Sequence, residues 1–331
     1  MKKTFENAIG FLPDSIRGKL EKLNDEIKNK TFEVRLRVKK PIVIITSDDT
    51  YFLNKNGNLT CVVSENLYLV TREEMKQSFN RLCNYSVYSY SESISQGFVT
   101  LDGGHRVGIS GTAVMKNSAV STIRDVNALN IRIAREFPGC ADELLKRAFN
   151  NRLKNIIIAG PPSSGKTTLL RDIARQISSG RFGFYHKVSI VDERFEISPV
   201  NDGECCCDTG PNTDVLSGFK KSDGIMCALR TLSPDLIICD EIGTVEECQA
   251  ISSGLNSGVN FVLSMHSSSL DELKRKPQFK LLIESGINAS VVLLKNIPCA
   301  ISDVFETGED NAENNSTGIS CFSLCSDRAV C

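Results

Sequence analysis

The chain has 331 residues, 41% of them hydrophobic and 24% charged, which is the balance of a soluble globular protein with room for two domains. Its 39 Lys and Arg residues nearly cancel its 40 Asp and Glu residues, so no net field favours nucleic acid as a partner. No signal-like apolar run follows the first residues, and no segment reaches the length of about eighteen apolar residues that a membrane span requires. We therefore expect a cytoplasmic protein with no nucleic-acid partner and no direct membrane span.

The first segment, 1–137, is predicted to be the smaller of two domains. Charged and apolar residues alternate over 33–38, as in a half-buried strand, and a second extended run follows at 41–45. Thr71 and Glu74 have the spacing of a capping box, which predicts that a helix begins at this point. This mixture of strands and helices indicates an α+β domain.

A β-hairpin is predicted later in the same segment. Two extended runs, 97–101 and 105–110, flank an Asp-Gly-Gly turn, and glycine accepts the positive φ that tight turns require. A further extended run at 129–135 leads to a turn signal at Pro138 and Gly139. We place the domain boundary at that turn.

The sequence between 155 and 177 has the form of a strand, a phosphate-binding loop and a helix. β-Branched residues dominate 155–159, and apolar residues recur at helical spacing over 168–177. Between them lies the pattern G-x-x-x-x-G-K-[ST], whose glycines let backbone N–H groups surround an anion. Lys166 would neutralise phosphate charge, and the Thr167 hydroxyl would hold Mg²⁺. The residues predicted to bind the nucleotide are Gly160, Pro161, Pro162, Ser163, Ser164, Gly165, Lys166, Thr167 and Thr168.

From 138 to 306, apolar strands alternate with helical stretches, which favours a mostly parallel sheet with crossover helices. Together with the phosphate loop, this alternation predicts an α/β domain of the RecA-like P-loop NTPase class. The last residues, 307–331, are polar and aperiodic and are predicted to form a disordered tail.

The strand predicted within 234–241 ends in two carboxylates, Asp240 and Glu241. We expect this strand to lie beside the phosphate-loop strand, so that Asp240 reaches Mg²⁺ directly or through water. Glu241 is then placed to polarise the water that attacks the γ-phosphate. A small-molecule kinase is a weaker alternative, because Glu241 follows Asp240 as a water-activating residue would.

Two further predicted strands end in residues that suit the same site. The run at 188–194 ends in Asp192 and Glu193, and the run at 261–266 ends in His266. Because the carboxyl ends of strands in open α/β sheets converge on the ligand crevice, all three side chains can face the nucleotide. The alternatives are solvated strand ends for the acids and a hydrogen-bonded histidine without a functional role.

The chain contains 13 cysteines, but their spacing does not form a recognisable metal or disulfide pattern. Three are contiguous at 205–207, three lie in the polar tail, and there is no C-x-x-C pair. We expect free thiols in a reducing cytosol, with a metal site as the alternative.

The phosphate loop, the two acidic strand ends and the histidine strand end resemble the four sequence boxes of the secretion and pilus-motor ATPases, in the same order. The chain more closely resembles the sporulation members of that family from endospore-forming bacteria. The resemblance covers about 30–300 and is carried by the segments 32–37, 103–108, 129–135, 191–194, 213–216 and 233–235. It implies a homo-hexameric ring that hydrolyses ATP with Mg²⁺ at the cytoplasmic face of a membrane. Its partners would be the membrane subunits of a sporulation channel.

The resemblance also implies roles for single residues. The residues implied in catalysis are Glu241, Glu193, His266 and three arginines of the N-terminal domain, Arg106, Arg132 and Arg135. The implied metal ligands are Thr167, Asp240 and Asp192. The alternative from a different class is a nucleotide-binding scaffold or switch that scarcely turns over.

Overall fold

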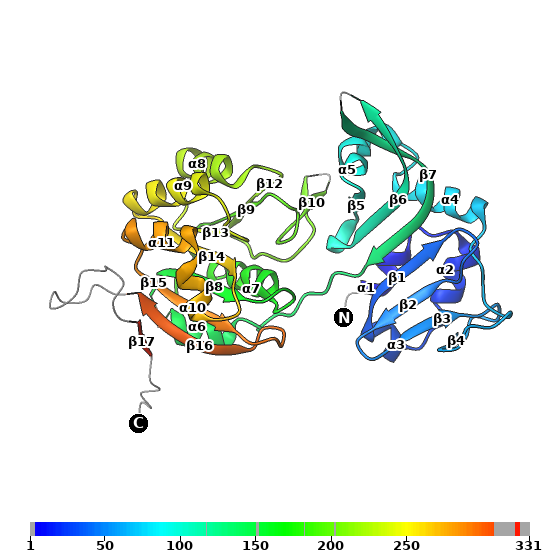
Figure 1. Ribbon diagram of the computed structural model, residues 1–331, viewed down its shortest axis with the longest axis horizontal. Coiled ribbons are helices and arrows are strands. Elements are labelled where there is room, and N and C mark those ends of the chain that lie inside the picture. Colours follow the sequence, from blue (N-terminus) through cyan, green and yellow to red (C-terminus); the bar gives the residue numbers. More distant parts are fainter. Residues whose placement is uncertain are drawn as a thin grey trace. The chain divides into compact units, whose positions relative to one another are not determined.

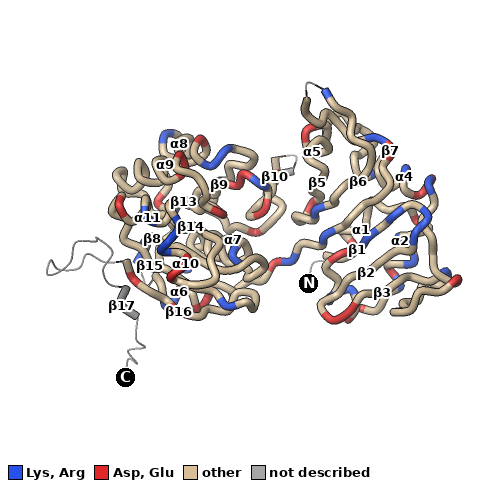
Figure 2. Tube along the Cα trace, viewed as in Figure 1, with Lys and Arg blue, Asp and Glu red and all other residues tan. Residues whose placement is uncertain are grey.

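The computed structural model describes residues 4–116, 118–149, 152–181, 183–201, 203–307 and 322–324 (Figure 1). The chain divides into two compact units, Met1–Arg135 and Glu136–Cys331. Within the residues described, no helix is both long and apolar enough to cross a membrane. Lys and Arg are interspersed with Asp and Glu along the trace of both units (Figure 2).

The N-terminal unit is built on an antiparallel sheet with the strand order β4-β3-β2-β1-β7-β6-β5 (Figure 1). The strands are β1 (Thr31–Arg37), β2 (Val43–Thr46), β3 (Thr50–Leu53), β4 (Leu59–Thr60), β5 (Phe98–Thr100), β6 (Arg106–Lys116) and β7 (Ala119–Arg132). The helices are α1 (Thr4–Ile9), α2 (Asp14–Leu20), α3 (Asp25–Lys30), α4 (Arg72–Leu82) and α5 (Ser91–Ser95), with 3-10 turns at Val87–Tyr90 and Asp102–Gly104. Their apolar side chains and those of the sheet form one core.

Two local predictions for this unit are confirmed. The Thr71 side chain accepts from the Glu74 N–H, and the Glu74 carboxylate accepts from the Thr71 N–H at 2.9 Å, which is the capping box that opens α4. The predicted hairpin is formed by β5 and β6, and Gly103 takes a φ of 78° in the turn between them.

Of the extended run predicted at 129–135, residues 129–132 are the last part of a much longer strand, and 133–135 lie beyond its end. β7 begins at Ala119 and pairs with β6 as far out as Lys116, so the two strands form a long hairpin arm. The outer residues of both strands are exposed or only half-buried. The sequence there lacks the alternation of apolar and polar residues that marks a strand with one buried face.

The C-terminal unit is an eight-stranded sheet with the order β12-β9-β13-β14-β8-β15-β16-β17, among the described residues. The first six strands in this order are parallel, and β16 and β17 continue the sheet antiparallel. The strands are β8 (Asn155–Gly160), β9 (Val188–Asp192), β12 (Thr213–Ser217), β13 (Leu236–Cys239), β14 (Asn260–His266), β15 (Ala289–Leu294), β16 (Ile301–Thr307) and β17 (Phe322–Leu324). A separate two-stranded ribbon joins β10 (Val200–Asn201) to β11 (Glu204–Cys205).

Helices cover both faces of this sheet. Along β8, Ile156 and Ile158 enter one core while Ile157 and Ala159 enter the other, and each buried Ile contributes about 1.5–3 kcal/mol. The first core is closed by α6 (Asp142–Ala148) and α7 (Lys166–Ser178). The second is closed by α8 (Lys221–Thr231), α9 (Val245–Asn256), α10 (Leu270–Arg275) and α11 (Pro277–Glu284). The predicted α/β fold with a mostly parallel sheet is thereby confirmed.

The expected position of the acidic strand is wrong. β13 pairs with β9 and β14, and β14 alone separates it from the phosphate-loop strand β8. The prediction failed because sheet order depends on pairings between segments that are distant in the chain. All residues of β13 are buried, so their apolar character does not indicate which strands lie on either side. The predicted tail, 307–331, lies outside the described residues apart from Thr307 and the three residues of β17.

Candidate nucleotide-binding site

The predicted phosphate loop joins β8 to α7 and depends on two glycines. Gly165 stands at the N-cap of α7 with a φ of 87°, and a Cβ there would lie 2.8 Å from both the backbone N and the Sγ of Cys299. A Cβ on Gly160 would lie 2.5 Å from the Ser164 Oγ. Both positions therefore exclude a side chain, and the loop keeps its backbone N–H groups at the start of a helix.

Lys166 begins α7 and is only 6% exposed. Its ammonium donates to the carbonyl oxygens of Gly160 and Pro161 at 3.0 and 2.9 Å. It also lies 3.2 Å from Nδ1 of His266. Burial lowers the pKa of Lys166, although the charges of Asp240 and Glu241 oppose that shift.

Thr167 and Asp240 meet where the helix start faces the strand end. The Thr167 hydroxyl donates to Oδ2 of Asp240 at 2.6 Å. The other oxygen of Asp240 accepts from the Ser264 hydroxyl, which in turn accepts from the Glu241 N–H at 2.9 Å. Ser264 is fully buried on β14, the strand that separates β13 from β8. It therefore connects the Asp240 carboxylate to the backbone N–H of Glu241.

Glu241 has a φ of 50°, in the left-handed region that non-glycine residues seldom occupy. Its carboxylate contacts Nε2 of His266 at 2.6 Å and Nη1 of Arg194 at 2.6 Å. His266 thus lies between Glu241 and Lys166, with one ring nitrogen facing each. The structure brings together Lys166 and Thr167 from the start of α7, Asp240 and Glu241 from the end of β13, and His266 from the end of β14.

The acidic residues at the end of β9 lie in two different environments. Asp192 is only 2% exposed, and its two carboxylate oxygens accept from the backbone N–H groups of 196, 197 and 198 at 2.9–3.0 Å. Burial raises the pKa of Asp192 against these hydrogen bonds. Glu193 is more exposed and lies 3.6 Å from the Lys221 ammonium. A small cavity beside them is lined by Asp192, Glu193, Arg194, Lys221, Asp240 and Glu241.

The three candidate arginines belong to the N-terminal unit. Arg106 and Arg132 stand opposite each other in the β6–β7 pairing, and the Arg106 guanidinium lies 3.6 Å from the Phe98 ring centroid. Arg135 donates to the carbonyl of Thr31 at 2.7 Å and lies over the Phe32 ring, and burial lowers its pKa. Arg135 is therefore held within its own unit, whereas Arg132 is exposed.

Several residues of the site were not predicted. Ser264, Arg194 and Lys221 all contact Glu241, yet none belongs to the phosphate loop or the acidic pair. Ser264 sits in an apolar strand, and a lone polar residue facing a core is the signal that could have revealed it. For Arg194 and Lys221 the signal is absent, because their contacts depend on which strands and helices adjoin.

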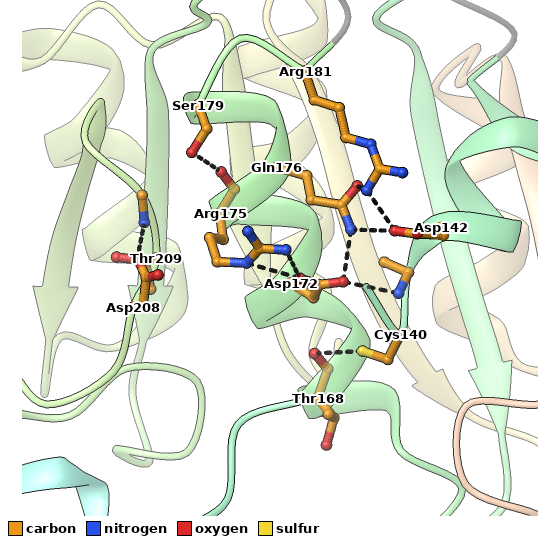
Figure 3. A network of polar contacts seen from close by, with 12 residues as sticks. Cys140, Asp142, Thr168, Asp172, Arg175, Gln176, Ser179, Arg181, Asp208 and Thr209 are labelled. Atoms are coloured by element: carbon orange, nitrogen blue, oxygen red, sulfur yellow. Dashed lines mark hydrogen bonds and ion pairs between the residues drawn. The ribbon is translucent and has the colours of Figure 1, made fainter. Parts of the chain in front are cut away.

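A polar network behind the loop fixes the direction of α7 (Figure 3). Asp172 accepts from the Ala141 N–H at 2.9 Å and from Arg175 and Gln176 at 2.6–2.9 Å. Burial alone would raise the pKa of Asp172, but these hydrogen bonds hold it below its usual value. The helix that presents Lys166 and Thr167 is thus tied to the chain just before α6.

The residues present fit a nucleotide and Mg²⁺. Within the described residues, the buried Ser164 hydroxyl of the phosphate loop has no hydrogen-bond partner. The Thr167 hydroxyl and the Asp240 carboxylate are hard oxygen ligands, and Mg²⁺ in such sites uses one or two carboxylates together with substrate phosphates. The cysteines that the structure describes are free thiols, and in that part of the chain no group of three His, Cys, Asp or Glu residues could hold a metal.

A mostly parallel sheet with a phosphate loop on one strand and an acidic pair on another is a P-loop fold, and solved secretion and pilus ATPases share it. The pilus retraction motor PilT, solved with bound ADP, aligns with a TM-score of 0.52 at 17% identity, over 80% of this chain and 74% of that one. The ATPase DotB of Yersinia pseudotuberculosis aligns with a TM-score of 0.50 at 16% identity, over 80% and 70% of the two chains.

The chain belongs to the family described as sporulation stage III, protein AA, whose model matches residues 2–309. Stage III sporulation protein AA of Bacillus subtilis is 34% identical over 311 residues, which are 93% of this chain and 97% of that protein. The resemblance found in the sequence is thereby confirmed at the level of the family and the fold.

Proposed function

We propose that the chain is an Mg²⁺-dependent ATPase that powers a membrane-associated, secretion-like channel during endospore formation. The observation that carries this proposal is the convergence of Lys166 and Thr167 with Asp240, Glu241 and His266. A phosphate loop alone would indicate only nucleotide binding. The adjoining acidic pair would add a metal ligand and a carboxylate that polarises water, both of which hydrolysis requires.

The chemistry follows from what each side chain can hold or move. Backbone N–H groups of residues 163–168 and the Lys166 ammonium would bind the phosphates. Thr167, Asp240 and Asp192 would hold Mg²⁺, which when bound would neutralise phosphate charge. Glu241 would orient and polarise the attacking water, with Glu193 as the alternative carboxylate for that role. His266 would hold the Glu241 carboxylate in place.

Two observations support the cellular setting. Membership of a sporulation family supports a role in endospore formation, and the shared fold with a pilus retraction motor supports work done on a larger complex. We propose a homo-hexamer at the cytoplasmic face of a membrane, bound there through the channel's membrane subunits. Arg106, Arg132 and Arg135 are the arginines proposed to reach nucleotide from the N-terminal domain.

A second function is favoured by the contacts of Glu241. Its carboxylate is engaged by both His266 and Arg194, and the Lys166 ammonium is engaged by loop carbonyls. If the Arg194 contact and the loop-carbonyl contacts of Lys166 persist when nucleotide binds, Glu241 cannot activate water, and the protein acts as a nucleotide-binding switch that scarcely hydrolyses ATP.

Binding and turnover measured on the same preparation separate the two functions. We expect the full chain to bind ATP with Mg²⁺ in a calorimetric titration and to release phosphate over many turnovers. Tight binding with release of no more than one phosphate per chain would favour the switch. No binding of ATP in either the presence or the absence of Mg²⁺ would contradict both.

A further inference from the structure

Lys221 is a buried cation beside the acidic strand end. It is the first residue of α8 and is only 6% exposed. Its ammonium donates to the Glu241 carbonyl at 2.8 Å, contacts the Glu247 carboxylate at 3.3 Å and lies 3.6 Å from the Glu193 carboxylate. A buried lysine is stable only with such partners, because desolvation of its charge is costly.

The shortest of these contacts is to the backbone of Glu241. At a φ of 50° this residue lies in a conformation that the chain must impose, since a side chain disfavours it. The Ser264 hydroxyl holds the Glu241 N–H, and Lys221 holds the Glu241 carbonyl. The peptide groups on both sides of the Glu241 Cα are therefore fixed by side chains from two other elements.

Lys221 also ties three segments together. Glu247 uses one carboxylate oxygen for Lys221 and the other for the N–H groups of Gly243 and Thr244, where the loop after β13 enters α9. Glu193 directly follows the neighbouring strand β9. One ammonium thus fixes the spacing between the two acidic strand ends and the start of α9.

We propose that Lys221 is a positioning residue for hydrolysis, which holds Glu241 in the left-handed backbone conformation that directs its carboxylate toward His266. The expected effect of Lys221 on the rate of ATP hydrolysis rests on the proposed function. Its effect on the conformation of Glu241 stands independently of that function. An ion pair that served stability alone would need only Glu247, and would place no requirement on the Glu241 carbonyl.

The test compares Lys221→Met with Lys220→Met in the full chain. Met keeps an unbranched side chain as far as Cε and removes the ammonium, and the exposed Lys220 supplies the same change at the adjacent position. For Lys221→Met we expect kcat for ATP to fall by about 10²-fold, the cost of a small misplacement, while the affinity for ATP stays within about twofold. Lys220→Met should match the unaltered protein in both.

A crystal structure of Lys221→Met provides the readout that does not depend on turnover. We expect Glu241 to leave the positive-φ region and its carboxylate to lose contact with His266. If Lys221→Met does not fold, the double variant Lys221→Met/Glu247→Gln is used instead. The second substitution removes the Glu247 charge that the loss of Lys221 leaves unpaired. An unmoved Glu241, or kcat within about twofold of the unaltered protein, would overturn the proposal. If the unaltered protein does not hydrolyse ATP, the proposed function fails. The conformation of Glu241 in the Lys221→Met crystal structure then decides by itself whether Lys221 positions Glu241.

Discussion

Thr167 and Asp240 stand 73 residues apart in the chain and share a hydrogen bond of 2.6 Å. The contact joins the first turn of α7 to the end of β13, across the width of β14. A hydroxyl and a carboxylate at this spacing are the pair from which a phosphate-loop protein builds its Mg²⁺ site.

Thr167→Ala removes that hydroxyl, whereas Thr167→Ser keeps it. Because a hydrogen bond or ligand at a charged group is worth about 1.5–3 kcal/mol, we expect Thr167→Ala to weaken Mg²⁺-dependent ATP binding by roughly tenfold to a hundredfold. Thr167→Ser should bind as the unaltered protein does. Calorimetric titration with and without Mg²⁺ measures both, and equal affinities for the Ala and Ser variants would exclude Thr167 from the metal site.

The affinity for ATP should depend on the charge of Lys166. Only the protonated ammonium attracts phosphate, and burial lowers the pKa of Lys166 from its usual 10.5. The affinity for ATP is therefore highest below the lowered pKa of Lys166 and falls as pH rises through that pKa. The fall occurs at a lower pH than it would for a lysine with an ordinary pKa. At such alkaline pH, binding should be accompanied by proton uptake, since phosphate favours the charged form.

Dissociation constants measured from about pH 7 to pH 10 test this dependence, with Lys166→Ala as the control. Lys166→Ala should bind ATP weakly at every pH and unfold at about the same temperature as the unaltered protein. Undiminished ATP turnover by Lys166→Ala would contradict a role for Lys166 in nucleotide binding.

Glu241→Gln preserves size and hydrogen bonding but removes the charge that polarises water. We expect ATP still to bind and kcat to fall by about 10²–10⁴-fold, the usual contribution of a general base. Glu246→Gln makes the same substitution at an exposed position on α9 and should leave kcat unchanged. If Glu241→Gln turns over normally, the catalytic role passes to Glu193, where Glu193→Gln repeats the comparison.

A ring with shared sites predicts that activity depends on protein concentration. Arg132 is exposed, and an arginine that reaches nucleotide from another subunit is worth about 10³–10⁵ in rate. Arg132→Ala should lower hydrolysis more than binding, whereas Arg124→Ala on the same strand should change neither. Sedimentation and phosphate release over a dilution series provide the measurement. A monomer with constant activity per chain at every concentration would refute the ring.

The phosphate loop could be predicted because its chemistry is contained in consecutive residues. Gly160, Gly165 and Lys166 act through the backbone and a helix start that adjoin them in the chain. The acidic pair at 240 and 241 could also be found, because an apolar strand that ends in carboxylates is a local signal.

The remaining contacts could not be predicted, because they depend on the order of strands. Ser264 joins Asp240 to Glu241 only because β14 lies beside β13, and Lys221 reaches Glu241 only because α8 packs beside that strand end. Ser264 could be singled out as a lone polar residue in an apolar strand, but neither its partners nor those of Lys221 can be deduced from the sequence around them. The outer part of the β6–β7 arm was missed because neither of its faces is buried.

The most direct test of the proposed function is phosphate release by the full chain with excess MgATP, followed over many turnovers. We predict continuous release that requires Mg²⁺, that Lys166→Ala abolishes, and that Glu241→Gln reduces by about 10²-fold or more while ATP stays bound. Release that stops at one phosphate per chain, or that is equal in the Glu241→Gln variant, would contradict an ATPase built on this site.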